Sequence, residues 1–351
     1  MNESHSDLSR SQQVMLFPTF VYFDEAEDVW KTQITGFVYA PGRDTMRQRM
    51  FLKLLRQVLG TNEQQLSQSE IFQERIQGFL HVPQKVKPIV FRVGRSEVEV
   101  TGRSKRSGHI RLSVNLNSAE IPDQFTASQA AGGPVDHHIR CRVALGNGDD
   151  REFTSEAVVI PPKGISVISD IDDTIKISQV AHRRQLLHNT FLHPFATVPG
   201  MAQLYDGWRK RGVAFHYVSS SPWQLFCPLD EFMTNAGFPN GSFHLRTYRF
   251  GDPTVLRLFL SRKRNKYNIM KSIFRMFPRR RFILIGDSGE KDPEIYGKVA
   301  RKFPEQIERI LIRRVEGRPW TRQRVAKAFR KIPKELWQSF RVPTQIGDLK
   351  A

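Results

Sequence analysis

The chain has 351 residues, which is enough for about two domains at roughly 150 residues each. Its composition, with 39% hydrophobic and 25% charged residues, is typical of a globular protein and excludes a collagen, a coiled coil and a disordered chain. The formal net charge of +19 predicts an anionic partner, which would be nucleic acid, an acidic membrane leaflet or a phosphorylated substrate.

The N-terminal residues 1–16 are polar, and we expect them to form a flexible tail. They lack the apolar core of a signal peptide, and no later stretch approaches 18 uninterrupted apolar residues. Cys141 and Cys227 stand alone without CxxC spacing, which argues against a disulfide framework and a structural zinc site. We therefore expect a cytoplasmic protein with no transmembrane segment, whose membrane contact, if any, is peripheral.

Residues 17–160 have the pattern of a β-rich companion domain. Short runs rich in β-branched and aromatic residues partly alternate with polar residues, and Asn147-Gly148 is a strong hairpin signal. One helical excursion is expected near 45–59, because methionine, leucine and valine recur there at helical spacing before Gly60. These features predict a sandwich-like domain, for which the immunoglobulin-like form is one candidate.

After Pro161-Pro162 the pattern changes, and residues 161–320 are predicted to form a second domain. Short apolar runs alternate with helix-length segments, for example Val198 to Arg211 and Asn265 to Met276. This alternation is typical of βαβ units around a parallel sheet. We therefore predict an α/β domain of the Rossmann type.

The first apolar run of this domain leads directly into a cluster of carboxylates. Asp170, Asp172 and Asp173 follow Ile165 to Ser169, with Thr174 next in line. Like charges this close repel each other unless a cation or hydrogen-bond donors compensate them, and hard oxygen ligands suit Mg²⁺. Active sites of α/β proteins lie at the carboxyl ends of parallel strands, so the cluster is a candidate site.

Two further strands and one helix carry polar groups that could join this cluster. Asp287 and Asp292 follow the apolar run Phe282 to Ile285, and the serines of Ser219-Ser220-Ser221 end another run. Serine hydroxyls and backbone N–H groups can bind phosphate oxygens. Lys266, on a predicted helix, could add a positive charge, although Lys263 and Lys271 lie on the same segment.

Together these four elements resemble the haloacid dehalogenase superfamily of phosphotransfer enzymes: DxDxT at Asp170, a serine at Ser219, a helical lysine, and GDxxxxD at Asp287. Four sequence segments are similar to those of one branch of this superfamily, the phosphatidate phosphatases of the actin-patch-protein type. These segments are DIDDTIK, PGMAQLY, VSSSPWQL and ILIGDSGEKDPEIY. The resemblance covers roughly residues 166 to 315.

The resemblance implies an Mg²⁺-dependent phosphomonoester hydrolase that acts through an aspartyl phosphate. By this resemblance, Asp170 would be the nucleophile and Asp172 would be the general acid and base. For both side chains to face the site, the chain must bend immediately after Asp170. The metal residues would be Asp170, Asp172 through its backbone carbonyl, Asp287, and Asp292, which would contact the metal through water. The phosphate-binding residues would be Thr174, Ser219, Ser220 and Lys266.

The substrate implied is phosphatidate or a related lipid phosphate. Only about 25 residues separate Thr174 from the helix near Pro199, so we expect a minimal cap and an open site. One alternative is a phosphatase for nucleic-acid ends or phosphoproteins. Another is a membrane- or partner-binding module with a vestigial phosphatase site.

Residues 321–351 are predicted to be a basic amphipathic C-terminal segment, with Val325, Ala328, Phe329 and Ile332 on one helical face. Such a helix can lie on an anionic membrane, or it can pack its apolar stripe onto the domain. Between Arg262 and Lys334 there are 23 Lys and Arg against 7 Asp and Glu. Most of the positive charge therefore accompanies the proposed phosphatase site, which favours an anionic lipid surface without excluding nucleic acid.

Overall fold

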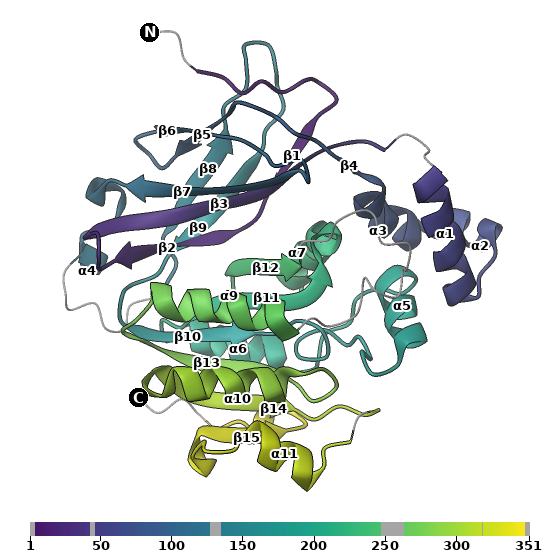
Figure 1. The fold of residues 1–351 in the computed structure, drawn as a ribbon, viewed down its shortest axis with the longest axis vertical. Coiled ribbons are helices and arrows are strands. Elements are labelled where there is room, and N and C mark those ends of the chain that lie inside the picture. The colour runs from purple at the N-terminus through teal and green to yellow at the C-terminus, as the bar shows by residue number, and fades with distance from the viewer. Residues whose placement is uncertain (1–3, 43–45, 127–134, 247–262, 318, 348–351) are drawn as a thin grey trace. The chain divides into compact units, whose positions relative to one another are not determined.

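The computed structural model divides into two compact units, which are described separately (Figure 1). Unit 1 is built from residues 1–43, 80–163 and 241–243, and unit 2 is built from residues 44–79, 164–240 and 244–351. The structure describes residues 4–42, 46–126, 135–246, 263–317 and 319–347.

Unit 1 contains one mixed sheet of nine strands. Hydrogen bonds order seven strands as β1-β3-β2-β9-β8-β5-β6, and β4 and β7 also pair with β3. The pair β2–β9 is parallel, whereas β3 is antiparallel to each of its partners. The β-rich prediction is confirmed, although the hydrogen bonds join the strands into one sheet rather than two separate ones. The strands are β1 (Gln13–Leu16), β2 (Thr19–Asp24), β3 (Val29–Ala40), β4 (Val82–Pro83), β5 (Ile89–Val93), β6 (Val98–Gly102), β7 (His109–Leu116), β8 (His138–Val143) and β9 (Thr154–Val159).

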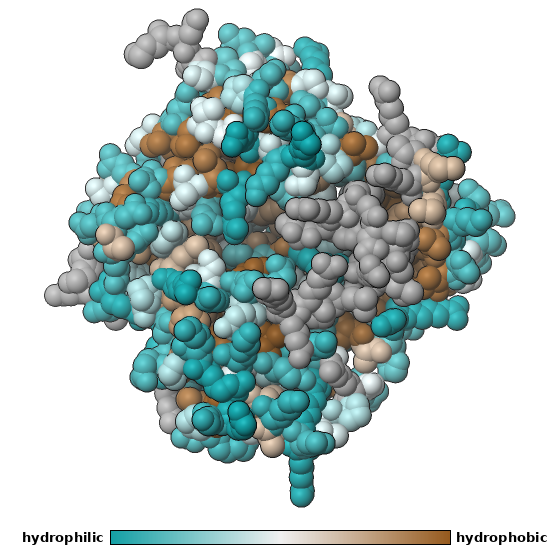
Figure 2. Space-filling view, in the orientation of Figure 1, coloured by the Kyte–Doolittle hydropathy of each residue, from teal (hydrophilic) through white to brown (hydrophobic). Residues whose placement is uncertain are grey.

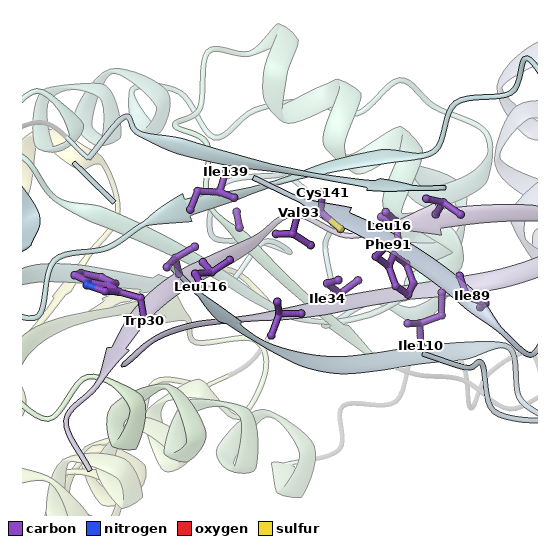
Figure 3. Packing of buried hydrophobic residues seen from close by; sticks show 14 of the residues in the cluster. Leu16, Trp30, Ile34, Ile89, Phe91, Val93, Ile110, Leu116, Ile139 and Cys141 are labelled. Carbon is purple, nitrogen blue, oxygen red and sulfur yellow. The ribbon is translucent and has the colours of Figure 1, made fainter. Parts of the chain in front are cut away.

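The core of unit 1 forms on the inward faces of these strands (Figure 3). In β7, Ile110 and Val114 are buried, whereas Arg111 and Ser113 are exposed, as the two-residue period of a half-buried strand requires. Cys141 lies in this cluster with Ile34, Phe91 and Ile139. The predicted hairpin at Asn147-Gly148 is present, because it connects the antiparallel strands β8 and β9, and Gly148 has φ +82°.

Unit 2 contains a six-stranded sheet in the order β12-β11-β10-β13-β14-β15, although the first two residues of β12 are assigned to unit 1. The pairs β10–β11, β10–β13, β13–β14 and β14–β15 are all parallel, as predicted from the alternating strand and helix pattern. The central strands read as continuous apolar runs because helices cover both faces. The strands are β10 (Gly164–Ser169), β11 (Ala214–Pro222), β12 (Ser242–Arg246), β13 (Arg280–Asp287), β14 (Ile307–Arg313) and β15 (Trp337–Phe340).

Helices cover the sheet of unit 2 in a Rossmann-like arrangement, with α9 and α10 on one face and α6 on the other (Figure 1). The helix predicted near 45–59 is present as α1, and α1 to α3 pack within unit 2 rather than with the strands that flank them in sequence. The helices are α1 (Met46–Leu59), α2 (Glu63–Gln68), α3 (Glu70–Leu80), α5 (Arg183–Phe191), α6 (Met201–Arg209), α7 (Phe226–Asn235), α9 (Lys263–Met276), α10 (Asp292–Lys302) and α11 (Arg322–Ala328); the short α4 (Asp123–Thr126) lies in unit 1.

The C-terminal segment contributes a short helix and a strand. The helix α11 ends at Ala328, and after Pro333 the chain adds β15 to the sheet. Ala328 and Phe329 are buried, so the apolar face of the segment packs onto the domain. Within the described residues, no helix is both long enough and apolar enough to cross a bilayer.

Candidate active site

The two acidic strand ends are neighbours. Ser169 pairs with Ile285 where β10 and β13 run in parallel, and the backbone N–H of Asp170 donates to the carbonyl of Ile285 at 2.9 Å. Asp170 therefore follows the end of β10 beside Asp287, the last residue of β13. Both carboxylates lie at the carboxyl edge of the sheet, where ligands of α/β proteins bind.

Three buried aspartates meet at this edge. Carboxylate oxygens of Asp170, Asp287 and Asp292 all lie within 4.8 Å of one another. Both oxygens of Asp170 and Oδ2 of Asp287 are buried and accept no hydrogen bond from the described residues. Burial raises the pKa of Asp170 and of Asp287 well above the ordinary value for an aspartic acid, and the Asp292 carboxylate adds to both increases.

A divalent cation would satisfy these oxygens. Buried carboxylates without donors are unfavourable, and a set of carboxylate ligands suits a hard cation such as Mg²⁺. Asp170, Asp287 and Asp292 therefore fit the predicted metal site.

Lys266 contacts this group. Its Nζ lies 3.1 Å from Oδ2 of Asp170 and donates to Oδ1 of Asp292 at 2.5 Å. Burial opposes the charge on this ammonium, but Asp170 and Asp292 raise its pKa above the ordinary value. Lys271 is only partly buried, and the side chain of Lys263 lies outside the described residues.

The chain bends directly after Asp170. The carbonyl of Ile171 accepts hydrogen bonds from the N–H groups of Thr174, Ile175 and Lys176, which closes a tight turn. Asp173 has φ +53° in this turn. Its carboxylate accepts from the backbone N–H groups of residues 178, 179 and 180, so its contacts brace the loop.

Asp172 lies apart from the three clustered aspartates. Its Oδ1 accepts from Ser178 at 2.7 Å and lies 2.8 Å from Nζ of Lys176, while its Oδ2 accepts from Ser221 at 2.6 Å and from Ser219 at 3.3 Å. Burial would raise the pKa of Asp172, but Lys176 and the serine hydroxyls lower it to about 2. The carboxylate of Asp172 is therefore bound to these partners, and the predicted role of its backbone carbonyl as a metal ligand stays a prediction.

The three serines at the end of β11 face two different groups. Ser219 and Ser221 contact Asp172, whereas Ser220 donates to Oε2 of Glu290 at 3.2 Å. Burial raises the pKa of Glu290 to about 7. Ser221 and Glu290 were not predicted, although the two-residue period of a strand places Ser221 on the same face as Ser219.

The predicted Thr174 is fully buried, and its Oγ1 has no hydrogen-bond partner in the described part of the chain.

Helix α3 supports the loop that follows this turn. Arg75 donates to the carbonyls of Thr190 and His193, each at 2.7 Å, and its guanidinium lies 3.6 Å from the ring centroid of Phe195. Nζ of Lys176 lies 4.6 Å from the centroid of the same ring. Neither contact was predicted, and Arg75 is separated from its partners by more than 100 positions in the sequence.

Comparison with known proteins identifies relatives of this half of the chain. Residues 165–314 match the family described as phosphatidate phosphatase APP1, catalytic domain. Phosphatidate phosphatase APP1 of Saccharomyces cerevisiae is 30% identical over 258 residues, which cover 71% of this chain and 41% of the relative. An uncharacterized protein of Schizosaccharomyces pombe is 36% identical over 169 residues, which cover 47% of this chain and 27% of the relative. The chain thus spans less than half the length of either curated relative.

Proposed function

Residues 165–314 belong to the family of APP1 phosphatidate phosphatase catalytic domains, a family of hydrolases, and we propose that this chain hydrolyses phosphatidate or a related lipid phosphate. The proposal extends to an Mg²⁺-dependent reaction that passes through an aspartyl phosphate.

One observation carries this proposal. Asp170 is buried at the carboxyl edge of the sheet, both of its carboxylate oxygens lack a hydrogen bond from the described residues, and Lys266 lies 3.1 Å from one of them. A purely structural aspartate would be expected to use its oxygens as acceptors. Apart from the ion pair of Oδ2 with Lys266, the oxygens of Asp170 are instead available for a metal ion and for attack on phosphorus.

In the proposed first step, an oxygen of Asp170 bonds to phosphorus as the bond from phosphorus to the alcohol oxygen breaks. Asp172 donates a proton to the departing oxygen. In the second step water attacks phosphorus, Asp172 accepts its proton, and the bond to Asp170 breaks to release phosphate. Asp172 is paired with Lys176 in the structure, so it must take up a proton before it acts as an acid.

Lys266 and the hydroxyls of Thr174, Ser219 and Ser220 are the candidate groups for binding the transferring phosphoryl oxygens. The metal would be held by Asp170, Asp287 and Asp292. A bound Mg²⁺ would supply the positive charge that allows an anionic nucleophile to approach an anionic phosphate.

The segment between Thr174 and α6 supports the proposal of a minimal cap. It contains one helix, α5, and no strand of its own. A small cap leaves room for a lipid headgroup that stays in its bilayer, so we propose that the protein works peripherally at a membrane in the cytoplasm. We also retain the proposal that its catalytic core is of the haloacid dehalogenase type.

The test compares phosphate release from phosphatidate vesicles, phosphorylated oligonucleotides and a small chromogenic ester, with Mg²⁺ or with EDTA. Wild type is compared with Asp170→Asn, and Asp206→Asn on α6 is the matched control. We expect release from phosphatidate that needs Mg²⁺ and is lost only in Asp170→Asn. Activity that survives Asp170→Asn would refute the nucleophile, a preference for oligonucleotides would overturn the lipid assignment, and no activity on any ester would favour a binding module.

A further inference from the structure

A cavity of about 300 Å³ lies at the carboxyl ends of β14 and β15, within unit 2. It is distinct from the three clustered aspartates, because none of them lines it. The lining residues are Arg314, Gln338, Ser339, Phe340, Arg341 and Gln345.

The strand register places this cavity on the same edge of the sheet as the candidate active site. Asp287 pairs with Arg313, and Arg313 pairs with Phe340, so these residues stand level on three successive strands. Neighbouring strands lie about 4.8 Å apart, which puts the backbone of Phe340 roughly 10 Å from that of Asp287. The surface of a binding partner that contacts the active site can therefore also contact the cavity.

The polar groups of the cavity suit an anion. It is lined by two arginines and by no carboxylate. Arg314 and Arg341 are both exposed, and no ion pair reaches either side chain from the described residues. Exposed guanidiniums without a carboxylate partner present their N–H donors to solvent, and these donors match the geometry of phosphate oxygens.

The wall of the cavity is held in place before any ligand binds. Oε1 of Gln345 accepts from the backbone N–H of Arg341 at 2.6 Å, and Nε2 of Gln338 donates to the carbonyl of Gln345 at 2.6 Å. The backbone N–H of Arg314 donates to the carbonyl of Phe340 at 2.7 Å. Because the amide oxygen of Gln345 is used by the backbone, its N–H groups remain to bind an acceptor.

We propose that this cavity is a second phosphate-binding site, separate from the catalytic one, which takes the phosphate of a lipid headgroup or free phosphate. The lipid source is favoured by Val342, an apolar side chain 50% exposed immediately after Arg341. Cationic donors beside an exposed apolar residue suit the interface of an anionic bilayer. Hydrophilic residues also dominate the visible surface over α10 and α11, near β15 (Figure 2).

The experiment uses the full chain with Arg314→Gln and Arg341→Gln combined. The control combines Lys302→Gln and Lys327→Gln, which removes the same charge from exposed residues outside the cavity. Binding to vesicles of phosphatidylcholine with and without phosphatidate is measured by sedimentation. Binding of inorganic phosphate is measured by calorimetry. All binding is measured in EDTA, so that no metal ion joins phosphate to the catalytic aspartates.

We expect the arginine variant to lose on the order of 10-fold in affinity for phosphatidate vesicles, while the lysine control changes much less. Hydrolysis of a soluble chromogenic ester should stay unchanged in both. Loss of binding to inorganic phosphate alone would identify free phosphate as the ligand of the site.

Equal behaviour of the arginine variant and the control in both binding measurements would overturn the proposal. Since these readouts need no turnover, an inactive catalytic site would leave them intact. Failure of the proposed function and failure of the cavity proposal are therefore distinguishable.

Discussion

The ammonium of Lys266 lies 3.1 Å from a carboxylate oxygen of Asp170 and brings a buried positive charge from α9 to the end of β10. Removing this charge leaves the proposed nucleophile and the transferring phosphoryl group without a cationic partner. We predict that Lys266→Met lowers kcat by about 10² to 10³-fold, the range typical for loss of one electrostatic stabiliser. Steady-state phosphate release measures this effect, and Lys271→Met on the same helix should retain normal turnover.

Substitutions at Asp172 and Lys176 should have strongly non-additive effects on the free energy of unfolding. Both side chains are buried and lie 2.8 Å apart, so Lys176→Met leaves an uncompensated carboxylate. We expect a loss of about 3 kcal/mol or more in the free energy of unfolding. The double variant Lys176→Met with Asp172→Asn should recover part of that loss. Denaturant unfolding of the double-mutant cycle provides the measurement, and purely additive effects would contradict the pairing.

Metal binding is predicted to release protons. Burial raises the pKa of Asp170 and of Asp287, so the metal-free site retains protons that a cation must displace. Mg²⁺ affinity should therefore increase as the pH rises, and Mg²⁺ should raise the Tm.

Calorimetry in two buffers of different ionisation enthalpy counts the released protons, and EDTA should reverse the increase in Tm. Asp287→Asn should weaken binding, whereas Asp206→Asn should not. An affinity independent of pH would contradict the raised pKa values.

Replacing either of two glycines in unit 2 with alanine should change the stability of the protein in opposite directions. A Cβ on Gly297 of α10 would come within 1.9 Å of the carbonyl oxygen of Ala328, whereas a Cβ on Gly207 of α6 meets nothing within 4 Å. Gly297→Ala should therefore destabilise the protein by about 1–3 kcal/mol by pushing α11 away. Gly207→Ala should stabilise it by roughly 1 kcal/mol, because alanine is the better helix former. Thermal unfolding distinguishes the two.

His81 in unit 1 predicts a contribution to acid sensitivity. Burial lowers the pKa of His81 to about 4, and its ring stacks on Tyr39 with the centroids 3.9 Å apart. The folded state prefers the neutral ring, so this stabilising contribution is complete above the unfolded pKa of about 6.5 and is lost as the pH falls toward 4.

Between pH 7 and pH 4.5, wild type should lose about 2 kcal/mol more in the free energy of unfolding than His81→Phe, which keeps the aromatic stack. Denaturant unfolding at the two pH values measures the difference. Equal losses in the two proteins would show that His81 protonates freely in the folded state.

The sequence by itself determined the class of unit 2 and the elements of the site. Apolar runs ending in Asp170 and Asp287 predicted a parallel sheet with carboxylates at its edge. Local hydrophobic patterning shows which segments are buried, and a residue at the end of a strand must lie at the edge of the sheet. The sequence favoured Lys266 as the helical lysine but left Lys263 and Lys271 open. The order of the strands could not follow from these local patterns, since β10 pairs with β13 across more than 100 residues.

Only the tertiary structure decided which side chains share a partner. It separates the carboxylate of Asp172 from the other aspartates and binds it to Lys176 and Ser221, and it brings Arg75 from a distant helix to support the loop near Phe195. Such contacts depend on how the chain turns after a strand and on which helices pack together. Those outcomes are set by burial and hydrogen bonding over the whole unit, so no short stretch of sequence contains them.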